Sequence, residues 1–142
     1  MTEFNGSCLC SGIQFSLQGE PQGVFACYCT DCSMNAGGPC QFTSRFSRSQ
    51  LQVQDPQSLI KVFVITQGTD SGYPKEKHFC GTCGCTLWTV PRKHGGEVIV
   101  VRTSLIKDGL TRLPPRTEVF VRNKPEYFTG CSDIKSFDGM FT

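Results

Sequence analysis

Phe79-Cys80-Gly81-Thr82-Cys83-Gly84 is the stretch of sequence that decides the fold of this chain. Two cysteines separated by two residues are typical of one half of a metal-binding cage, because a tight bend between them brings both sulfurs to the same side. The glycine that follows the second cysteine tolerates the backbone angles that such a bend often requires. The pattern therefore predicts a metal-binding turn at Cys80 and Cys83.

The other half of the cage is predicted near the start of the chain, at Cys8 and Cys10. In an extended strand, residues two positions apart point the same way, so these two sulfurs would lie on one side of the strand. Cys8, Cys10, Cys80 and Cys83 together give the four-sulfur site that zinc favours. A structural zinc there would close most of the chain into one loop and supply folding free energy on the order of 10 kcal/mol, as in isolated metal-binding peptides. Buried free thiols are the alternative.

A second group of cysteines, Cys27, Cys29 and Cys32, offers three thiolates and no obvious fourth ligand. Catalytic zinc sites characteristically hold three protein ligands and leave the fourth position for water or substrate. Three thiolates make the ion a weak Lewis acid towards water and favour a soft ligand, such as the sulfur of a substrate thiol or thioether. We therefore expect a second, catalytic zinc at which a carbon–sulfur bond is made or broken.

Three further cysteines keep other interpretations open. If Cys40, Cys85 or Cys131 completed the shell of the second zinc, that zinc would be structural as well. Nothing in the sequence fixes which cysteines approach one another. Reversible oxidation of the same three side chains would instead make the protein a redox sensor.

Length and composition favour one intracellular domain. A chain of 142 residues can bury one modest core. A formal charge of +2 with scattered Lys and Arg excludes the concentrated basic face of a nucleic-acid-binding protein. The first residues lack a signal peptide and no segment is long enough to span a bilayer, so we expect a cytoplasmic protein without a membrane partner. In that reducing compartment the ten cysteines indicate metal ligands, and five disulfides in a secreted domain are the alternative.

Short runs of alternating apolar residues, rich in β-branched and aromatic side chains, predict a mostly β chain with short helical turns. The predicted strands are residues 13–17, 24–27, 41–44, 59–66, 85–90, 97–102 and 117–122. A single helical turn is predicted at residues 30–35. Residues 131–142 have weak patterning and would either wrap around the body of the protein or fray.

Some polar side chains outside the cysteines are candidates for binding a ligand. Arginine binds carboxylates in a bidentate fork and could recognise a glutathione-like ligand, but we expect each arginine to be solvated surface charge. The arginines concerned are Arg45, Arg48, Arg102 and Arg122. We expect His78 to be a structural neighbour of the four-cysteine site and His94 to be an exposed turn residue.

The cysteine pattern resembles that of the glutathione-dependent formaldehyde-activating enzyme family, which also includes the centromere protein V domain. The resemblance is carried by Gly6-Ser-Cys-x-Cys10, Cys27-x-Cys-x-x-Cys32, Gly37-Gly-Pro39 and Phe79-Cys-x-x-Cys-Gly84 followed by Leu87. The later stretches Ser104-Leu-x-x-Asp108 and Pro114 to Phe128 support it. It spans nearly the whole chain, so residues 1–142 are expected to form a single domain of this family.

The resemblance implies a mostly β, tent-like fold stabilised by two zincs. The structural zinc would occupy the four-cysteine site and the catalytic zinc the three-cysteine site. Members of the family are linked to carbon–sulfur lyase chemistry on glutathione adducts, typified by S-hydroxymethylglutathione. The implied small-molecule partner is therefore glutathione or a thiol conjugate.

The chain departs from the family pattern at two positions. Tyr28 stands where the family usually has His, and Ser11 precedes Gly12 where the family usually has Gly directly after the first Cys-x-Cys. On an extended backbone, Tyr28 would point away from the metal and pack against or line an adjacent wall. These differences make a larger or different thiol conjugate an alternative substrate.

The sequence thus predicts a zinc-dependent carbon–sulfur lyase that acts on a glutathione adduct or a related thiol conjugate. Cys27, Cys29 and Cys32 would hold the zinc that captures the substrate sulfur. A non-catalytic, zinc-stabilised binding module is the alternative, because zinc-knuckle β folds also serve protein interaction.

Overall fold

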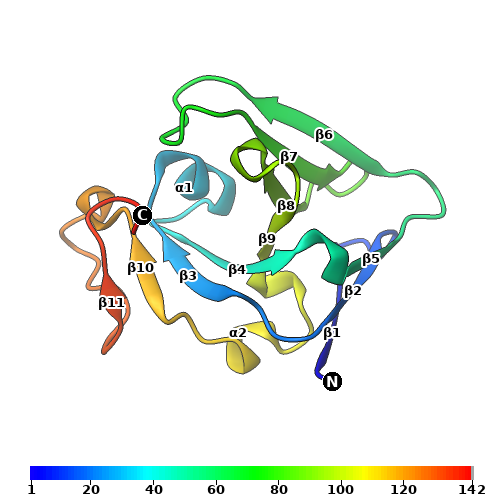
Figure 1. The fold of residues 1–142 in the computed structure, drawn as a ribbon, viewed down its shortest axis with the longest axis horizontal. Coiled ribbons are helices and arrows are strands. Elements are labelled where there is room, and N and C mark those ends of the chain that lie inside the picture. The colour runs from blue at the N-terminus through cyan, green and yellow to red at the C-terminus, as the bar shows by residue number, and fades with distance from the viewer. Residues whose placement is uncertain (142) are drawn as a thin grey trace.

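Two β-sheets form the body of the protein in the computed structural model, which describes residues 1–141 (Figure 1). The smaller sheet contains β1 (Glu3–Ser7), β2 (Gln14–Gln18) and β5 (Leu51–Gln54). The larger sheet contains β3 (Gly23–Cys27), β4 (Gln41–Ser47), β6 (Ile60–Ile65), β7 (Lys75–Cys80), β8 (Thr86–Pro91), β9 (Val98–Arg102), β10 (Thr117–Val119) and β11 (Lys135–Ser136). The prediction of a mostly β chain is confirmed.

The helices are short, as predicted. They are α1 (Thr30–Ala36), α2 (Gly109–Arg112) and 3₁₀ turns at Arg48–Gln50, Arg92–His94, Thr103–Leu105 and Val121–Asn123. None of the helices in residues 1–141 has the length and apolar character needed to cross a membrane. The helix predicted at residues 30–35 is therefore present, and it ends where Gly37 adopts a left-handed conformation.

The strand order of the larger sheet is β11-β10-β3-β4-β9-β8-β7-β6. Neighbours from β3 to β6 are antiparallel, whereas β10 pairs in parallel with both β3 and β11. Cys27 lies opposite Gln41, and Thr43 lies opposite both Phe25 and Arg102. Directly opposed side chains share one face of an antiparallel sheet, so these residues from three strands meet on the face that carries Cys27.

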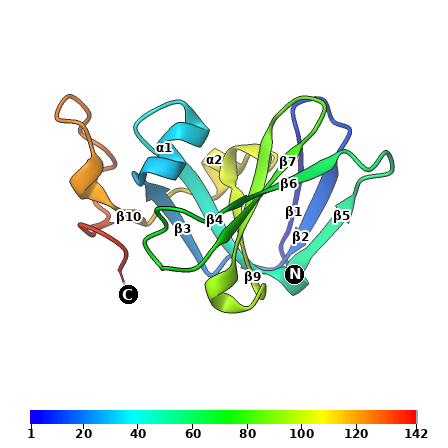
Figure 2. The same ribbon diagram turned by 90° about the horizontal axis from the view of Figure 1, so that it is seen from above.

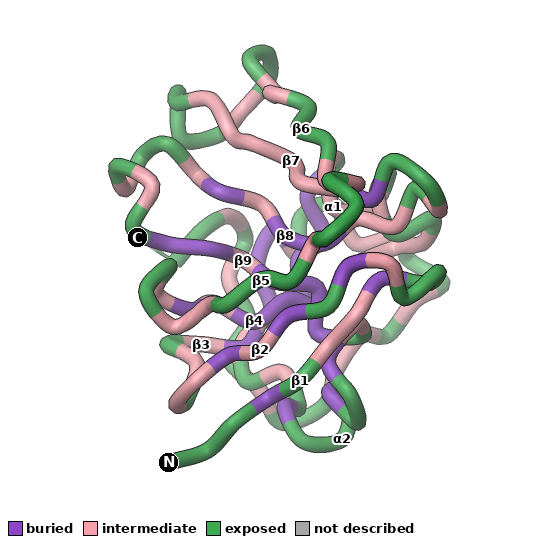
Figure 3. The backbone as a smooth tube through the Cα atoms, turned by 90° about the vertical axis from the view of Figure 1, so that its right-hand side faces the viewer, coloured by how far each residue is buried: buried purple, intermediate pink, exposed green. Residues whose placement is uncertain are grey.

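The smaller sheet covers the other face of the larger sheet, and the main core lies between them. Successive strand residues alternate between the two faces, so the core takes every second residue of β4, β8 and β9. The Phe15 and Trp88 rings meet edge to face with centroids 5.5 Å apart. Figure 3 shows the buried stretches of these strands gathered in the middle of the molecule. Buried members of this core include Phe4, Phe15, Leu17, Val24, Phe46, Trp88, Val90, Ile99 and Val101.

Each predicted strand is present, although its ends differ from the prediction. The strand predicted at residues 117–122 ends at Val119, because Phe120 has a left-handed φ of 60° and a 3₁₀ turn follows. The predicted runs of alternating apolar residues do not include β1, β5, β7 or β11, and α2 was not predicted. Asn5 and Gly6 disfavour a strand locally, and β1 exists because its residues pair with β2.

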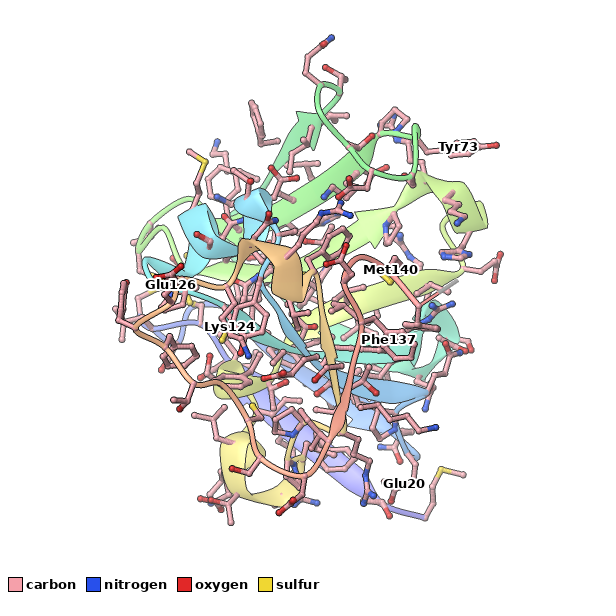
Figure 4. The ribbon with its side chains drawn as sticks, turned by 90° about the vertical axis from the view of Figure 1, so that its left-hand side faces the viewer. Glu20, Tyr73, Lys124, Glu126, Phe137 and Met140 are labelled. Carbon is pink, nitrogen blue, oxygen red and sulfur yellow. The ribbon has the colours of Figure 1, made fainter. Side chains whose placement is uncertain are left out.

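The C-terminal segment, residues 124–141, runs along the β10 edge of the larger sheet and does not fray. The Phe137 N–H donates to the Glu118 carbonyl over 2.9 Å, and the Phe141 ring stacks on Phe25 at 5.6 Å. Figure 2 shows this segment at the end of the molecule opposite the smaller sheet, and Figure 4 shows it passing beside β10. The last residue of the predicted segment, at position 142, lies outside the described residues.

Gly109, at the start of α2, packs too closely for a side chain. A Cβ atom there would collide with the Thr103 carbonyl oxygen, which is backbone and cannot move aside cheaply. We expect Gly109→Ala to lower the free energy of unfolding by about 2 kcal/mol in urea denaturation. Gly38→Ala is the matched control, because a Cβ at Gly38 meets nothing within 4 Å. Equal stability of the two variants would contradict the packing at α2.

Candidate functional site

The four-cysteine cluster, defined as Cys8, Cys10, Cys80 and Cys83, joins two turns that are distant in sequence. The Cys10 sulfur lies 3.5 Å from the Cys8 sulfur and 3.7 Å from the Cys80 sulfur. All four sulfurs lie within 4.8 Å of one another. Sulfurs around a tetrahedral ion with bonds of about 2.3 Å are roughly 3.8 Å apart, so this cluster can hold a metal ion.

The turn that carries Cys8 and Cys10 differs from the predicted extended strand. β1 ends at Ser7, and the Ser11 N–H donates to the Cys8 carbonyl over 3.1 Å. Ser11 completes this turn in a left-handed conformation with a φ of 65°. The prediction that an extended strand aligns the two sulfurs is therefore wrong, because a tight turn brings them together.

The turn at Cys80 agrees with the prediction. The backbone N–H groups of Thr82 and Cys83 each lie 3.4 Å from the Cys80 sulfur. Gly84 has a φ of 74° and donates its N–H to the Cys80 carbonyl over 2.8 Å. Both N–H groups are directed at the Cys80 sulfur, so this turn fixes the sulfur in position as a ligand of the cluster.

We expect Cys80→Ser to give unfolded or aggregated protein, because the four-cysteine cluster connects the smaller sheet to β7. Circular dichroism and thermal melting with and without a chelator would measure the effect. Cys85→Ser is the matched control, since Cys85 is partly buried nearby but lies outside the cluster. A Cys80→Ser protein that melts like the Cys85→Ser protein would exclude a structural role for the cluster.

The three-cysteine cluster, defined as Cys27, Cys29 and Cys32, lies where β3 passes into α1. Cys27 ends β3, Cys29 is the N-cap of α1, and Cys32 lies in the first turn of that helix. The Cys32 N–H donates to the Cys29 sulfur over 3.4 Å. The three sulfurs lie within 4.8 Å of one another, so this cluster can also hold a metal ion.

Crowding changes the acidity of these thiols. Hydrogen bonds from the Cys27 and Cys32 thiols lower the pKa of Cys29 to about 2. The hydrogen bond with Cys29 contributes most to raising the pKa of Cys27. One thiolate is thus stabilised by its neighbours, but three adjacent thiolates would repel one another. A divalent cation removes this repulsion, and the cluster therefore favours a metal ion.

No fourth Cys, His, Asp or Glu within residues 1–141 joins this group of sulfurs. Cys40 and Cys131 pack against the hydrophobic cluster that contains Cys27, Tyr28 and Cys29, but neither sulfur joins the group. Cys85 packs against the main core on the side of the four-cysteine cluster. In this arrangement none of the three remaining cysteines completes the shell.

Arg102 places a buried positive charge beside the three-cysteine cluster. It is only 4% exposed, and its Nη1 donates to Thr89 Oγ1 over 3.1 Å and to the Val100 carbonyl over 3.3 Å. Burial lowers the pKa of Arg102, and the negative charges of the nearby cysteine sulfurs counteract that effect. Its Nε finds no acceptor among the described residues. The expectation that Arg102 is solvated surface charge is wrong, because β9 turns this residue towards the cysteine-bearing face.

Lys75 brings a second cation to the cluster, and Asp31 balances it. The Lys75 ammonium lies 2.7 Å from Asp31 Oδ2, which ties β7 to α1. Burial alone would lower the pKa of Lys75, but the contact with Asp31 and the charges of Cys29 and Cys32 raise it above its usual value. Lys75 therefore stays protonated beside the sulfurs.

A cavity of about 290 Å³ opens over the three-cysteine cluster. The three cysteines, Thr43 and Arg102 line it, together with residues of β8, β10 and the C-terminal segment. Its volume is close to the lower end of small-molecule sites, roughly 300 Å³. A ligand in this cavity can therefore reach the sulfurs and the guanidinium together.

Tyr28 lies on the other side of the backbone and does not line this cavity. Its ring is 1% exposed, and its hydroxyl donates to Glu118 Oε1 over 2.9 Å. Glu118 also accepts from the Cys131 N–H over 2.7 Å and from the Ser136 hydroxyl over 3.0 Å. Glu118 thus links Tyr28, which lies between Cys27 and Cys29, to the C-terminal segment. Glu118 was not predicted as a functional residue, because its only sign in the sequence is a carboxylate inside an apolar strand.

Burial alone would raise the pKa of the Glu118 carboxyl, but the hydrogen bonds from Cys131, Tyr28 and Ser136 outweigh it and hold the pKa below its ordinary value. A carboxyl with a depressed pKa stabilises the fold above the unfolded pKa, and this stabilisation is lost as the pH falls through the folded value. The contact between Tyr28 and Glu118 should therefore contribute to stability at neutral pH and lose its contribution in acid.

We expect Tyr28→Phe to lower the free energy of unfolding at neutral pH by about 2 kcal/mol, because Glu118 loses a donor to its buried charge. The difference from the wild type should shrink as the pH falls below the ordinary glutamate pKa of 4.5. Denaturant titration at a series of pH values measures both. Tyr127→Phe, at a side chain that is 84% exposed, is the control. If the free energies of unfolding of wild type and Tyr28→Phe differed by the same amount at every pH, the hydrogen bond to the carboxylate would not be the source of the difference.

The other polar candidates from the sequence fall in different places. His78 Nε2 lies 3.1 Å from Glu76 Oε1, as a packing neighbour and not a ligand. His94 lies in a turn as predicted, but it is half-buried and lines the cavity. Arg48 and Arg122 are exposed, as expected of surface charge.

The fold and the site define a mostly β protein with two cysteine clusters that can hold metal ions, one of them open to a cavity. The chain belongs to the glutathione-dependent formaldehyde-activating enzyme family, whose model matches residues 3–123. The predicted family is therefore confirmed.

One relative and one solved structure extend this result. A protein of Schizosaccharomyces pombe that is named an uncharacterised lyase is 25% identical over 142 residues, which are all of this chain and 93% of that protein. A crystal structure of a Rhodobacter sphaeroides protein matches with a TM-score of 0.54 and 19% identity, over 71% of this chain and 85% of that one. The structural match shows a shared fold.

Proposed function

We propose that this chain is a zinc-dependent carbon–sulfur lyase that acts on a glutathione adduct or a related thiol conjugate. The observation that carries the proposal is the three-cysteine cluster, which opens into a cavity and gains no fourth ligand from residues 1–141. The name of the family supports a glutathione-linked substrate, and the name of the yeast relative supports lyase chemistry. We take residues 1–142 as one domain of this family.

The donor sets of both clusters suit zinc, because thiolates are soft ligands and the sulfur spacings fit a tetrahedral ion. Cys8, Cys10, Cys80 and Cys83 would hold a structural zinc, and Cys27, Cys29 and Cys32 a catalytic one. A zinc ion in the three-cysteine cluster would supply an open position for the substrate sulfur and lower the pKa of its thiol.

The surrounding residues prepare this site for an anionic sulfur. Three thiolates outweigh the charge of one divalent ion, and a substrate thiolate adds another negative charge. The buried guanidinium of Arg102 offsets part of this charge, and such compensation is stronger in a site removed from water. Lys75, held by Asp31, adds positive potential on the α1 side. The cavity therefore favours a thiolate over a neutral thiol.

The first test of this function is turnover. Zinc-loaded protein should release or form free thiol from glutathione conjugates, and Cys29→Ser should lower that rate by at least about a hundredfold, because a ligand is lost. Cys40→Ser is the matched control, since Cys40 is partly buried next to α1 but lies outside the cluster. Equal turnover by Cys29→Ser and Cys40→Ser proteins would remove the proposed role of the cluster.

X-ray absorption at the zinc edge tests the open position directly. Without thiol, the average shell of the two ions should contain a light oxygen or nitrogen ligand in addition to sulfur. Addition of glutathione should replace that ligand by sulfur. A shell made only of sulfur before glutathione is added would show that the protein itself closes the site. The result would then favour a non-catalytic zinc-stabilised binding module.

A further inference from the structure

The cavity carries unpaired positive charge at the end away from the three-cysteine cluster. Arg45, Lys93 and His94 line that end. Arg45 lies on β4, and the other two lie in the 3₁₀ turn that follows β8. Arg45 was a candidate for binding a glutathione carboxylate in the sequence but was expected to be surface charge, and Lys93 and His94 were expected in no site. The turn and the strand meet only in the folded protein.

The strand register fixes how far this end lies from the sulfurs. On β3 and β4, Cys27 lies opposite Gln41 and Gly23 lies opposite Arg45. Along β4, four residues of extended strand separate Gln41, which lies opposite Cys27, from Arg45. This separation is roughly 13 Å at about 3.3 Å per residue. Arg45 shares a face with Thr43, since the two are two residues apart on one strand. The basic end and the sulfurs thus belong to one continuous surface.

Burial and the charges of Arg45 and Lys93 together lower the pKa of His94, so the three side chains lie close enough to influence one another. The lowered pKa favours the neutral ring of His94, which can donate one N–H without adding charge. Arg45 and Lys93, whose charges both act on His94, are the cations at this end of the cavity.

Among the other charges of the cavity, Arg102 lies beside the cysteine sulfurs, and the remaining ones have ionic partners. Lys75 pairs with Asp31 at 2.7 Å, and Asp70 lies 3.7 Å from Arg122. Arg45 uses its Nε to donate to a glutamine, Gln22, over 2.9 Å. Within residues 1–141, neither Arg45 nor Lys93 has an acidic partner within 4.0 Å. Two like charges at one end of a cavity favour an anionic group of the ligand.

We propose that Arg45 and Lys93, with His94 as a hydrogen-bond donor, form a carboxylate subsite that selects thiols bearing a carboxylate at a distance from the sulfur. The inference rests on the proposed function, since the sulfur must occupy the three-cysteine cluster for the carboxylate to reach the basic end. A guanidinium and an ammonium suit this group, because the first forms a bidentate fork and the second a point charge. Glutathione, with its thiol in the middle and a carboxylate at each end, is the probe.

The experiment compares two thiols on zinc-loaded protein by calorimetry. Glutathione carries carboxylates, whereas 2-mercaptoethanol is a neutral thiol without them. In the double variant Arg45→Gln/Lys93→Gln, the affinity for glutathione should fall by about tenfold or more, as expected when a ligand charge loses its hydrogen-bonded partners. The affinity for 2-mercaptoethanol should stay within about twofold, because that thiol reaches only the sulfur cluster.

The control variant is Arg48→Gln/Lys107→Gln, which removes the same two charges from exposed positions that do not line the cavity. Its affinity for glutathione should match the wild type. A higher salt concentration should weaken glutathione binding to the wild type and to the control more than to the cavity variant.

The possible failures are distinguishable. If the wild type binds 2-mercaptoethanol but the cavity variant binds glutathione as tightly as the control does, the carboxylate subsite is overturned and sulfur capture stands. If the affinities of the cavity variant for glutathione and for 2-mercaptoethanol fall equally, the substitutions disturb the folded site as a whole. The carboxylate subsite is then also overturned. If the wild type binds neither thiol, the proposed capture of sulfur fails and the subsite fails with it.

Discussion

The convergence of four cysteine sulfurs from two distant turns is the constraint on which the rest of the structure depends. It holds the turn after β1 against the turn after β7, and so brings the smaller sheet to one face of the larger sheet. Phe15 and Trp88 then meet in the core between the sheets. Because one face of the larger sheet is used for the core, the other face is left to line a cavity. A chain with a core of this size gains much from such a cross-link.

Side chains alternate along the strands between the core face and the cavity face of the larger sheet. On β4, Phe46 enters the core, whereas Thr43 and Arg45 face the cavity. On β9, Val101 enters the core and Arg102 faces the cavity. A buried arginine in a neutral environment would be costly, and here the adjacent cysteine sulfurs compensate its charge. The same pleat that builds the core therefore supplies the cation that a cluster of thiolates requires.

The C-terminal segment completes the site although it lies beyond residues 3–123, the part of the chain that the family model matches. Met140 and Phe141 line the cavity, and Glu118 ties this segment to Tyr28 between two cysteines of the cluster. Hydrogen bonds to Glu118 thus connect the segment that forms a wall of the cavity to the loop that carries the sulfurs.

The sequence by itself determined the mostly β class, the family and the grouping of the cysteines, because strand alternation and Cys-x-x-Cys spacing are local patterns that survive without tertiary context. It could not place Arg102, which reads as surface charge until β9 pairs with β4 and turns it towards the sulfurs. Nor could it pair Tyr28 with Glu118 or bring Arg45 to Lys93, since these contacts join residues far apart in the chain. Sheet order and register decide which side chains share a face, and only the tertiary structure fixes them.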